Sequence, residues 1–357
     1  MPALVTGLIG LLGGFVIGVL VQRSRLCTFG AMEDALMGQD WRRMKVFGLA
    51  LAVALLVTQG LILTGALDAD RVTYLPARLP IAGLVVGGVM FGVGMALVGT
   101  CGFGSLVRLG TGDLRSLVVV IVFGTLAYAA LRGILSGFRI GVIEQWAIPM
   151  PGATRADFPS LLARLVGVDP RLALTGLAAA ILLWLALSDK RLRRAKRLLT
   201  AGAALGLVTG LGWAATGWWS DPFDLHQRPQ SLTFVAPIAR AIFGVLAGQD
   251  QITDFGIASV LGVVLGAFAS SLHAREFRWE AFDDHHEMRR HLSGAALMGL
   301  GGVLAGGCTI GQGLSAGSLF AVSMPIVLVS MMLGARIGIA IVMGDAREWF
   351  GRIRGTS

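Results

Sequence analysis

Nine apolar segments, each close to the length of a membrane-spanning helix, dominate this sequence. A helix needs about 20 apolar residues to cross the hydrocarbon core of a bilayer. The 357-residue chain is 55% hydrophobic and only 14% charged, so a water-soluble core could not hold all of these segments. The sequence therefore predicts an all-α integral membrane protein. The predicted spans are residues 3–21, 43–66, 81–98, 114–136, 171–188, 199–217, 255–272, 290–306 and 318–343.

Four shorter stretches are too short or too polar to span, and they are rich in Gly, Ser and Thr. They lie near residues 27–38, 102–110, 231–246 and 309–317. Such segments are tolerated at membrane depth only where they are buried in protein or line a cavity. We predict that they are re-entrant half-helices.

A cysteine between glycines occurs twice. One shift of the sequence places Gly99, Cys101 and Gly104 on Gly306, Cys308 and Gly311. Upstream, and at nearly the same shift, Gln22-Arg23 followed by Cys27-Thr28-Phe29 matches Gln227-Arg228 followed by Leu232-Thr233-Phe234. Two matches in the same order indicate an internal duplication.

The predicted span count makes this duplication an inverted one. Each repeat has four spans, and a fifth span links them, so the second repeat starts from the opposite side of the membrane. In many transporters with inverted repeats the site lies at the repeat interface. We predict a single integral membrane domain with four parts. They are a first repeat (1–140), a connector with the fifth span and a basic loop (141–198), a second repeat (199–345) and a tail (346–357).

The formal net charge is +9, and the basic residues cluster in short loops, most densely at residues 190–197. In a soluble protein such charge would suggest nucleic acid; in a membrane protein it marks the cytoplasmic loops. We therefore expect no nucleic-acid partner. The pattern predicts a periplasmic N-terminus, and a cytoplasmic C-terminus and tail.

The three cysteines form no CxxC pair, so neither a disulfide framework nor a metal site is predicted, and we expect no cofactor. Half-helix N-termini attract anions, and glycines let the backbone approach a ligand. Desolvation keeps an apolar thiol protonated, and a neutral S–H is a weak donor with a polarizable surface. This chemistry suits a soft, sulfur-bearing anion. The predicted path residues are Cys27, Cys101, Cys308, Thr28, Thr100, Gly102, Gly307, Thr309 and Gln312.

The motifs around Cys27, Cys101 and Cys308 resemble those of the YeeE/YedE family of bacterial inner-membrane proteins. The resemblance covers nearly the whole chain and implies nine spans, short helices and an hourglass-like path. It also implies a transporter for thiosulfate, which three cysteines pass along by weak S–H contacts. A small cytoplasmic TusA-like sulfur carrier is the implied partner. Leu232 stands where the second repeat could have kept a fourth cysteine.

Three alternatives stay open at this point. One is an intramembrane sulfurtransferase-like protein in which a cysteine becomes a persulfide. The second is transport of a different sulfur or selenium species, and the third is a structural subunit of a larger complex. Two further features have simpler readings. The His-rich residues 283–291 are predicted to be a solvated loop, and Arg336 is close enough to a span end to reach the headgroups.

Overall fold

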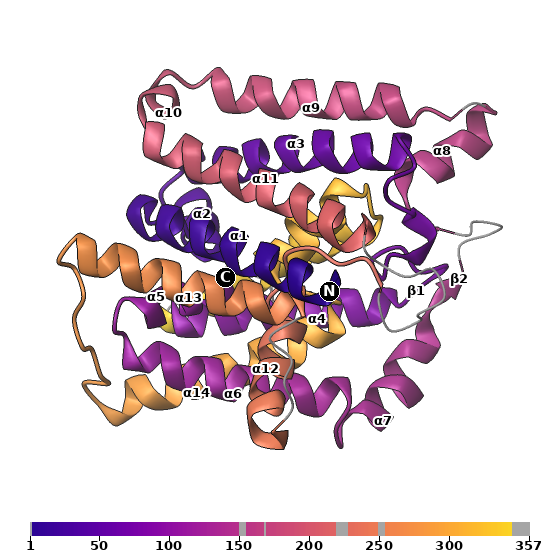
Figure 1. Ribbon diagram of the computed structural model, residues 1–357. Coiled ribbons are helices and arrows are strands. Elements are labelled where there is room, and N and C mark those ends of the chain that lie inside the picture. The colour runs from indigo at the N-terminus through magenta and orange to yellow at the C-terminus, as the bar shows by residue number, and fades with distance from the viewer. Residues whose placement is uncertain (1, 150–154, 168, 219–227, 249–253, 345–357) are drawn as a thin grey trace, which may run out of the picture.

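The computed structural model describes residues 2–149, 155–167, 169–218, 228–248 and 254–344, and the described chain is predominantly helical (Figure 1). The predicted tail (346–357) and Gln227 of the upstream repeat match lie outside these residues. A single antiparallel pair of two-residue strands, β1 (Arg78–Leu79) and β2 (Ile148–Pro149), joins Leu79 to Ile148 and Arg78 to Pro149.

The helices of the first part of the chain include both long and short elements. They are α1 (Pro2–Ser24), α2 (Thr28–Leu36), α3 (Arg42–Leu63), η1 (Ala69–Arg71), α4 (Ile81–Val98), α5 (Gly102–Gly110), α6 (Leu114–Leu131), α7 (Ser136–Phe138), η2 (Arg139–Ile143) and η3 (Glu144–Trp146). The later helices are α8 (Phe158–Val166), α9 (Arg171–Leu187), α10 (Lys190–Arg194), α11 (Lys196–Trp218), α12 (Val235–Ala247), α13 (Phe255–His273), α14 (His285–Leu304), η4 (Gly311–Ala316) and α15 (Ser323–Val342).

Within the described residues, seven helical segments are long and apolar enough to cross a membrane, and they contain α1, α3, α4, α6, α11, α13 and α15. This confirms the predicted all-α, multi-pass membrane protein. Two predicted spans fall outside this group for different reasons. Helix α9 is apolar but has 17 residues, and α14 begins with the polar run from His285 to His291. The count of nine spans therefore stays a prediction.

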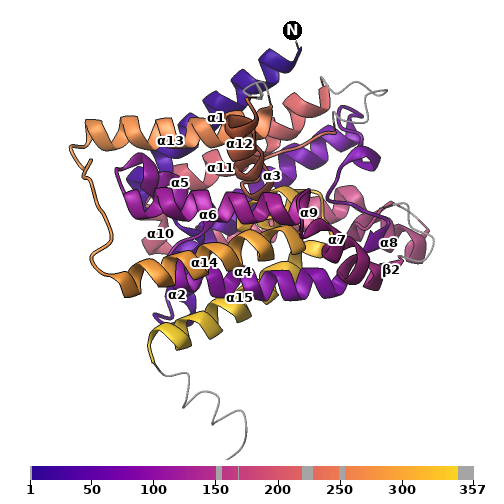
Figure 2. The same ribbon diagram turned by 90° about the horizontal axis from the view of Figure 1, so that it is seen from below.

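The long helices run side by side, and helices from the two halves of the chain alternate (Figures 1 and 2). Helix α1 packs along α13 and α3 along α11, while α4 contacts both α14 and α15, and α14 also contacts α6. The contact of α1 with α13 is backbone to backbone. A Cβ at Gly14 or Gly18 would overlap the carbonyl oxygens of Ser259 or Val263. Glycine permits this separation in membranes, so these glycines serve packing within one chain.

The bundle has two different ends. At one end lie α10 and the connection between α13 and α14 (274–284), and we call this the basic end. At the opposite end lie β1, β2 and α8, and we call this the connector end (Figure 1).

Candidate functional site

The first glycine-flanked cysteine lies at a sharp reversal of the chain. Helix α4 ends at Gly99, whose φ of 77° is a left-handed conformation that glycine adopts without strain. Two residues later Cys101 is the N-cap of α5, and its Sγ accepts a hydrogen bond from the Gly104 amide at 3.3 Å. The thiol therefore lies at the positive end of the short helix α5.

The second motif repeats this geometry. Gly306 and Gly307 have φ values of 68° and 154°, and Cys308 follows them directly. Its Sγ accepts from the Gly311 amide at 3.4 Å, and the chain continues as the π-helix η4. Both thiols thus cap an amide three residues ahead of them.

Cys27 and Cys101 lie together with two predicted hydroxyls. Cys27 is the N-cap of α2, and its Sγ lies 3.5 Å from Thr100 Oγ1. Cys101 Sγ donates to Thr28 Oγ1 at 3.9 Å. We call these four residues the first thiol cluster. Cys27 thus contacts the threonine that precedes Cys101, and Cys101 contacts the threonine that follows Cys27.

The first thiol cluster adjoins a cavity of about 610 Å³ at the basic end. Cys27 and Thr100 line it, whereas Cys101 is fully buried. Charged side chains surround this cavity, and arginines outnumber glutamates, so its net positive charge favours anions. The charged lining residues are Arg25, Arg108, Arg275, Arg278, Glu276 and Glu280.

Cys308 is enclosed, with 1% of its surface exposed. Thr309 beside it is also buried, and its hydroxyl oxygen has no hydrogen-bond partner among the described residues. Buried polar groups are normally paired, so an unpartnered hydroxyl next to the thiol is available to a ligand. The amide of Gln312, a predicted path residue, is engaged within the protein. Its Nε2 donates to Ala305 O at 2.9 Å, and its Oε1 accepts from Ser323 Oγ at 3.1 Å.

The two predicted glycines face aromatic residues. A Cβ at Gly102 would lie 3.4 Å from the Phe123 ring, and one at Gly307 would lie 3.4 Å from the Tyr74 hydroxyl.

Tyr74 was not predicted as a site residue, because it belongs to the connection between α3 and α4, which has no helical or repeat pattern. Its only sequence signal is rarity, since the chain has two tyrosines.

The two cysteine-bearing regions meet at an aromatic contact. Phe103, two residues after Cys101, and Phe234, next to Thr233, are both buried. Their ring centroids are 4.8 Å apart and their planes are tilted by 33°. The Phe103–Phe234 contact therefore joins the first cysteine motif to the second half of the chain.

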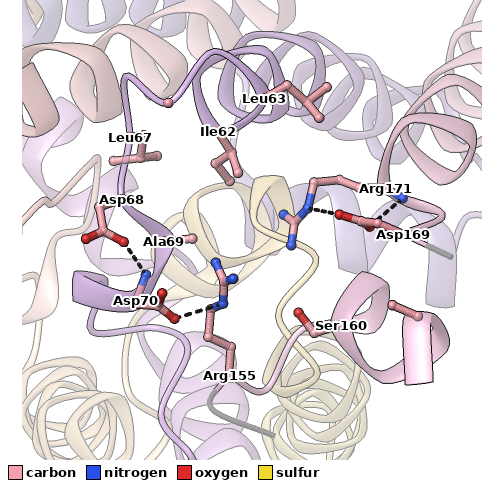
Figure 3. A pocket seen from close by; sticks show the side chains of 12 residues that line it. Ile62, Leu63, Leu67, Asp68, Ala69, Asp70, Arg155, Ser160, Asp169 and Arg171 are labelled. Carbon is pink, nitrogen blue, oxygen red and sulfur yellow. Dashed lines mark hydrogen bonds and ion pairs between the residues drawn. The ribbon is translucent and has the colours of Figure 1, made fainter. Parts of the chain in front are cut away.

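A second cavity, of about 690 Å³, lies at the connector end (Figure 3). Its cations are paired within the protein: Arg155 with Asp70 at 2.9 Å, and Arg171 with Asp157 at 2.6 Å. Arg171 also donates to Gln59 Oε1 at 3.1 Å. Because aspartates outnumber arginines in its lining, this cavity is a poorer anion site than the one at the basic end.

The remaining charged features lie away from both thiol regions. Arg336 is exposed on α15. His285 and His286 are exposed at the start of α14, and His291 contacts the Glu287 carbonyl oxygen at 2.9 Å. The described residues contain no group of three or more His, Cys, Asp or Glu side chains placed to hold a metal ion.

Comparison with known proteins gives a consistent result. The profile of a family described as sulphur transport matches residues 23–337. A curated relative from Spirochaeta thermophila, named thiosulfate transporter TsuA, is 28% identical over 333 residues, which cover 91% of this chain and 96% of the relative. A protein of the same name from Escherichia coli is 28% identical over 335 residues, covering 91% of each chain.

Proposed function

Because this chain belongs to the sulphur transport family, and is a transporter rather than an enzyme, we propose that it takes up thiosulfate into the cytoplasm. The relatives named thiosulfate transporters support the choice of anion. The observation that carries the proposal is the first thiol cluster. It places two thiols and two hydroxyls at half-helix N-termini beside an arginine-lined cavity.

The proposed path runs past Cys308, Cys101 and Cys27. Thiosulfate carries negative charge and a polarizable terminal sulfur. Neutral S–H groups, hydroxyls and helix N-termini attract it without the strong binding of a buried cation. Conduction requires such weak, multiple contacts. Thr28, Thr100 and Thr309 supply the hydroxyls of this path, and Gly102 and Gly307 leave the backbone open. The engaged amide of Gln312 supports a role in fixing the turn before Cys308.

The packing supports inverted repeats with the predicted boundaries. In the predicted repeats α1 corresponds to α11 and α3 to α13. The contact of α1 with α13 then has its counterpart in the contact of α11 with α3. In the same way α4 corresponds to α14 and α6 to α15, so the contact of α4 with α15 has its counterpart in the contact of α14 with α6. The short elements α2 and α5 then correspond to α12 and η4, so the four half-helices would be re-entrant in pairs.

We place the protein in the bacterial inner membrane with the basic end in the cytoplasm and the N-terminus outside. The location of α10 at the basic end supports this orientation. An impermeant maleimide added to intact spheroplasts should label Cys308 before Cys27, if it labels either. Faster labelling of Cys27 from outside would reverse the orientation. The basic end is also where a TusA-like carrier would receive the anion.

The direct test is uptake by purified protein in liposomes. We expect saturable uptake of labelled thiosulfate, which empty liposomes lack. Cells without other thiosulfate uptake should also grow on thiosulfate as the sole sulfur source when they express this protein. A Cys27→Ala/Cys101→Ala/Cys308→Ala variant with normal uptake and growth would exclude the cysteine path, and absence of uptake by the wild-type protein would exclude the proposed substrate.

A further inference from the structure

The two halves of the chain differ at the positions that form the first thiol cluster. Aligning Cys101 with Cys308 places Thr100 on Gly307, and the upstream match places Cys27-Thr28 on Leu232-Thr233. The second half therefore keeps one thiol, Cys308, and one hydroxyl, Thr233. It lacks the thiol and the hydroxyl that form the pair between Cys27 and Thr100 in the first half.

The side chain of Tyr74, which belongs to neither repeat match, lies near Cys308 in the second half of the chain. The Tyr74 hydroxyl reaches this region from the connection between α3 and α4 and lies on the same side of Gly311 as the Thr233 hydroxyl. A Cβ on Gly307 would lie 3.4 Å from the Tyr74 hydroxyl, and a Cβ on Gly311 would lie 2.7 Å from it. The absence of a side chain at Gly311 therefore leaves the room that the phenol hydroxyl occupies, and Gly307 adjoins it at an ordinary contact distance.

The position of Tyr74 is fixed by a buried cluster at the connector end. Its ring meets Trp213 edge-on, with centroids 6.3 Å apart, and Trp213 Nε1 donates to Ser318 Oγ at 3.2 Å. Val72 and Leu75 on either side of it are buried in the same cluster. Burial raises the pKa of the Tyr74 hydroxyl, and the nearby Cys308 thiol acts in the same direction. The phenol therefore remains a neutral donor at physiological pH.

We propose that Tyr74 is a further substrate-binding residue, whose hydroxyl contacts the transported anion next to Cys308 and replaces the thiol and hydroxyl missing from the second half. The proposal rests on the proposed function, because it adds a donor to the same path. Together with Cys308 and Thr233, Tyr74 forms what we call the second thiol cluster. An anion at Cys308 would then accept an O–H hydrogen bond from Tyr74 or from Thr233, because both hydroxyls lie beside Gly311.

Substitution of the two tyrosines gives a matched pair of variants. Tyr74→Phe keeps the ring that packs on Trp213 and removes only the hydroxyl. Tyr128→Phe is the control, because Tyr128 lies on α6 and stacks on Phe243 at 4.3 Å. In proteoliposomes we expect Tyr74→Phe to raise the KM for thiosulfate by about tenfold, the usual scale for a lost hydrogen bond to a charged group, with Tyr128→Phe within about twofold of wild type.

A rescue variant separates a binding role from a structural one. Leu232→Cys in the Tyr74→Phe background restores a thiol at the position equivalent to Cys27, and we expect it to recover part of the lost KM. An unchanged KM in Tyr74→Phe, or a raised KM that Leu232→Cys does not lower, would overturn the role of Tyr74. Wild-type liposomes distinguish the two proposals, because no thiosulfate uptake by wild type overturns the proposed function itself.

Discussion

The first and second thiol clusters have the same backbone cap but different surroundings. In both, the cysteine sulfur accepts from the amide three residues ahead, at 3.3 Å for Cys101 and 3.4 Å for Cys308. The first cluster adjoins a 610 Å³ cavity lined by four arginines, whereas Cys308 is 1% exposed. The glycine-cysteine motif therefore determines the local geometry, and residues outside the motif determine access to the thiol.

The difference extends to the ion pairs at the two ends. At the connector end Arg171 and Asp157 form a buried pair, with side-chain exposures of 6% and 0%. Arg171 also donates to Gln59, whose Nε2 donates to Ser318 O at 2.7 Å, just after η4. At the basic end, Arg25 and Glu276 are 3.8 Å apart, and their side chains are 81% and 50% exposed. The Arg171–Asp157 pair is thus buried in the protein, whereas the Arg25–Glu276 pair is solvated.

Among the substitutions that test this comparison, removal of Arg171 should cause the largest loss of folding stability. Arg171→Met leaves Asp157 charged and buried, and breaking a buried pair costs about 3–5 kcal/mol of folding free energy. We expect a large drop in the temperature at which the purified protein loses its monodisperse gel-filtration peak. Arg155→Met is the control, since its partner Asp70 is 59% exposed. Equal loss in both variants would show that burial of the carboxylate partner does not set the cost of losing the arginine.

Cysteine substitutions test whether both clusters contact the anion. A hydrogen bond to a charged group contributes about 1.5–3 kcal/mol, so Cys101→Ala and Cys308→Ala should each lower kcat/KM for thiosulfate by about 10- to 100-fold. Cys101→Ser and Cys308→Ser keep a donor and should retain part of the activity. Proteoliposome uptake measures both series. Full activity of Cys308→Ala alone would restrict the anion path to the first cluster.

Two neighbouring glycines test how tightly the first cluster is packed. A Cβ at Gly104 would overlap Thr100 Oγ1, whereas one at Gly102 would lie 3.4 Å from the Phe123 ring, an ordinary contact. Gly104→Ala should displace the Thr100 hydroxyl and, through loss of its hydrogen bond to the anion, lower thiosulfate uptake by about tenfold. Gly102→Ala should stay within about threefold of wild type. The reverse order would place the anion nearer Gly102 than Thr100.

Arg25 should give the smallest effect. The exposed Arg25 attracts the anion through solvent, and an exposed charge contributes at most about 1 kcal/mol. Arg25→Gln should therefore lower uptake by less than about fivefold, and added inert salt should reduce the difference from wild type because it screens exposed charges. Arg336→Gln, exposed on α15, is the control with the same charge change. A salt-independent loss would show that Arg25 contacts the anion directly.

Most of the fold could be predicted from the sequence, because apolar length and glycine spacing are local properties. The short helices α2, α5, α12 and η4 lie where glycine-rich, short segments were expected. The site was less predictable. The amide of Gln312 is engaged by Ala305 and Ser323, and Tyr74 arrives from an irregular connection. Both results depend on tertiary packing, which no sequence spacing encodes.

The close glycine contacts between α1 and α13 have a mechanical consequence. Since a Cβ at Gly14 or Gly18 would already overlap the α13 backbone, these helices cannot approach further, and sliding would separate many contacts at once. The partners come from opposite halves of the chain, so rocking one half against the other would disrupt this interface. We therefore expect a stiff helical frame, in which side chains and the short helices move while an anion passes.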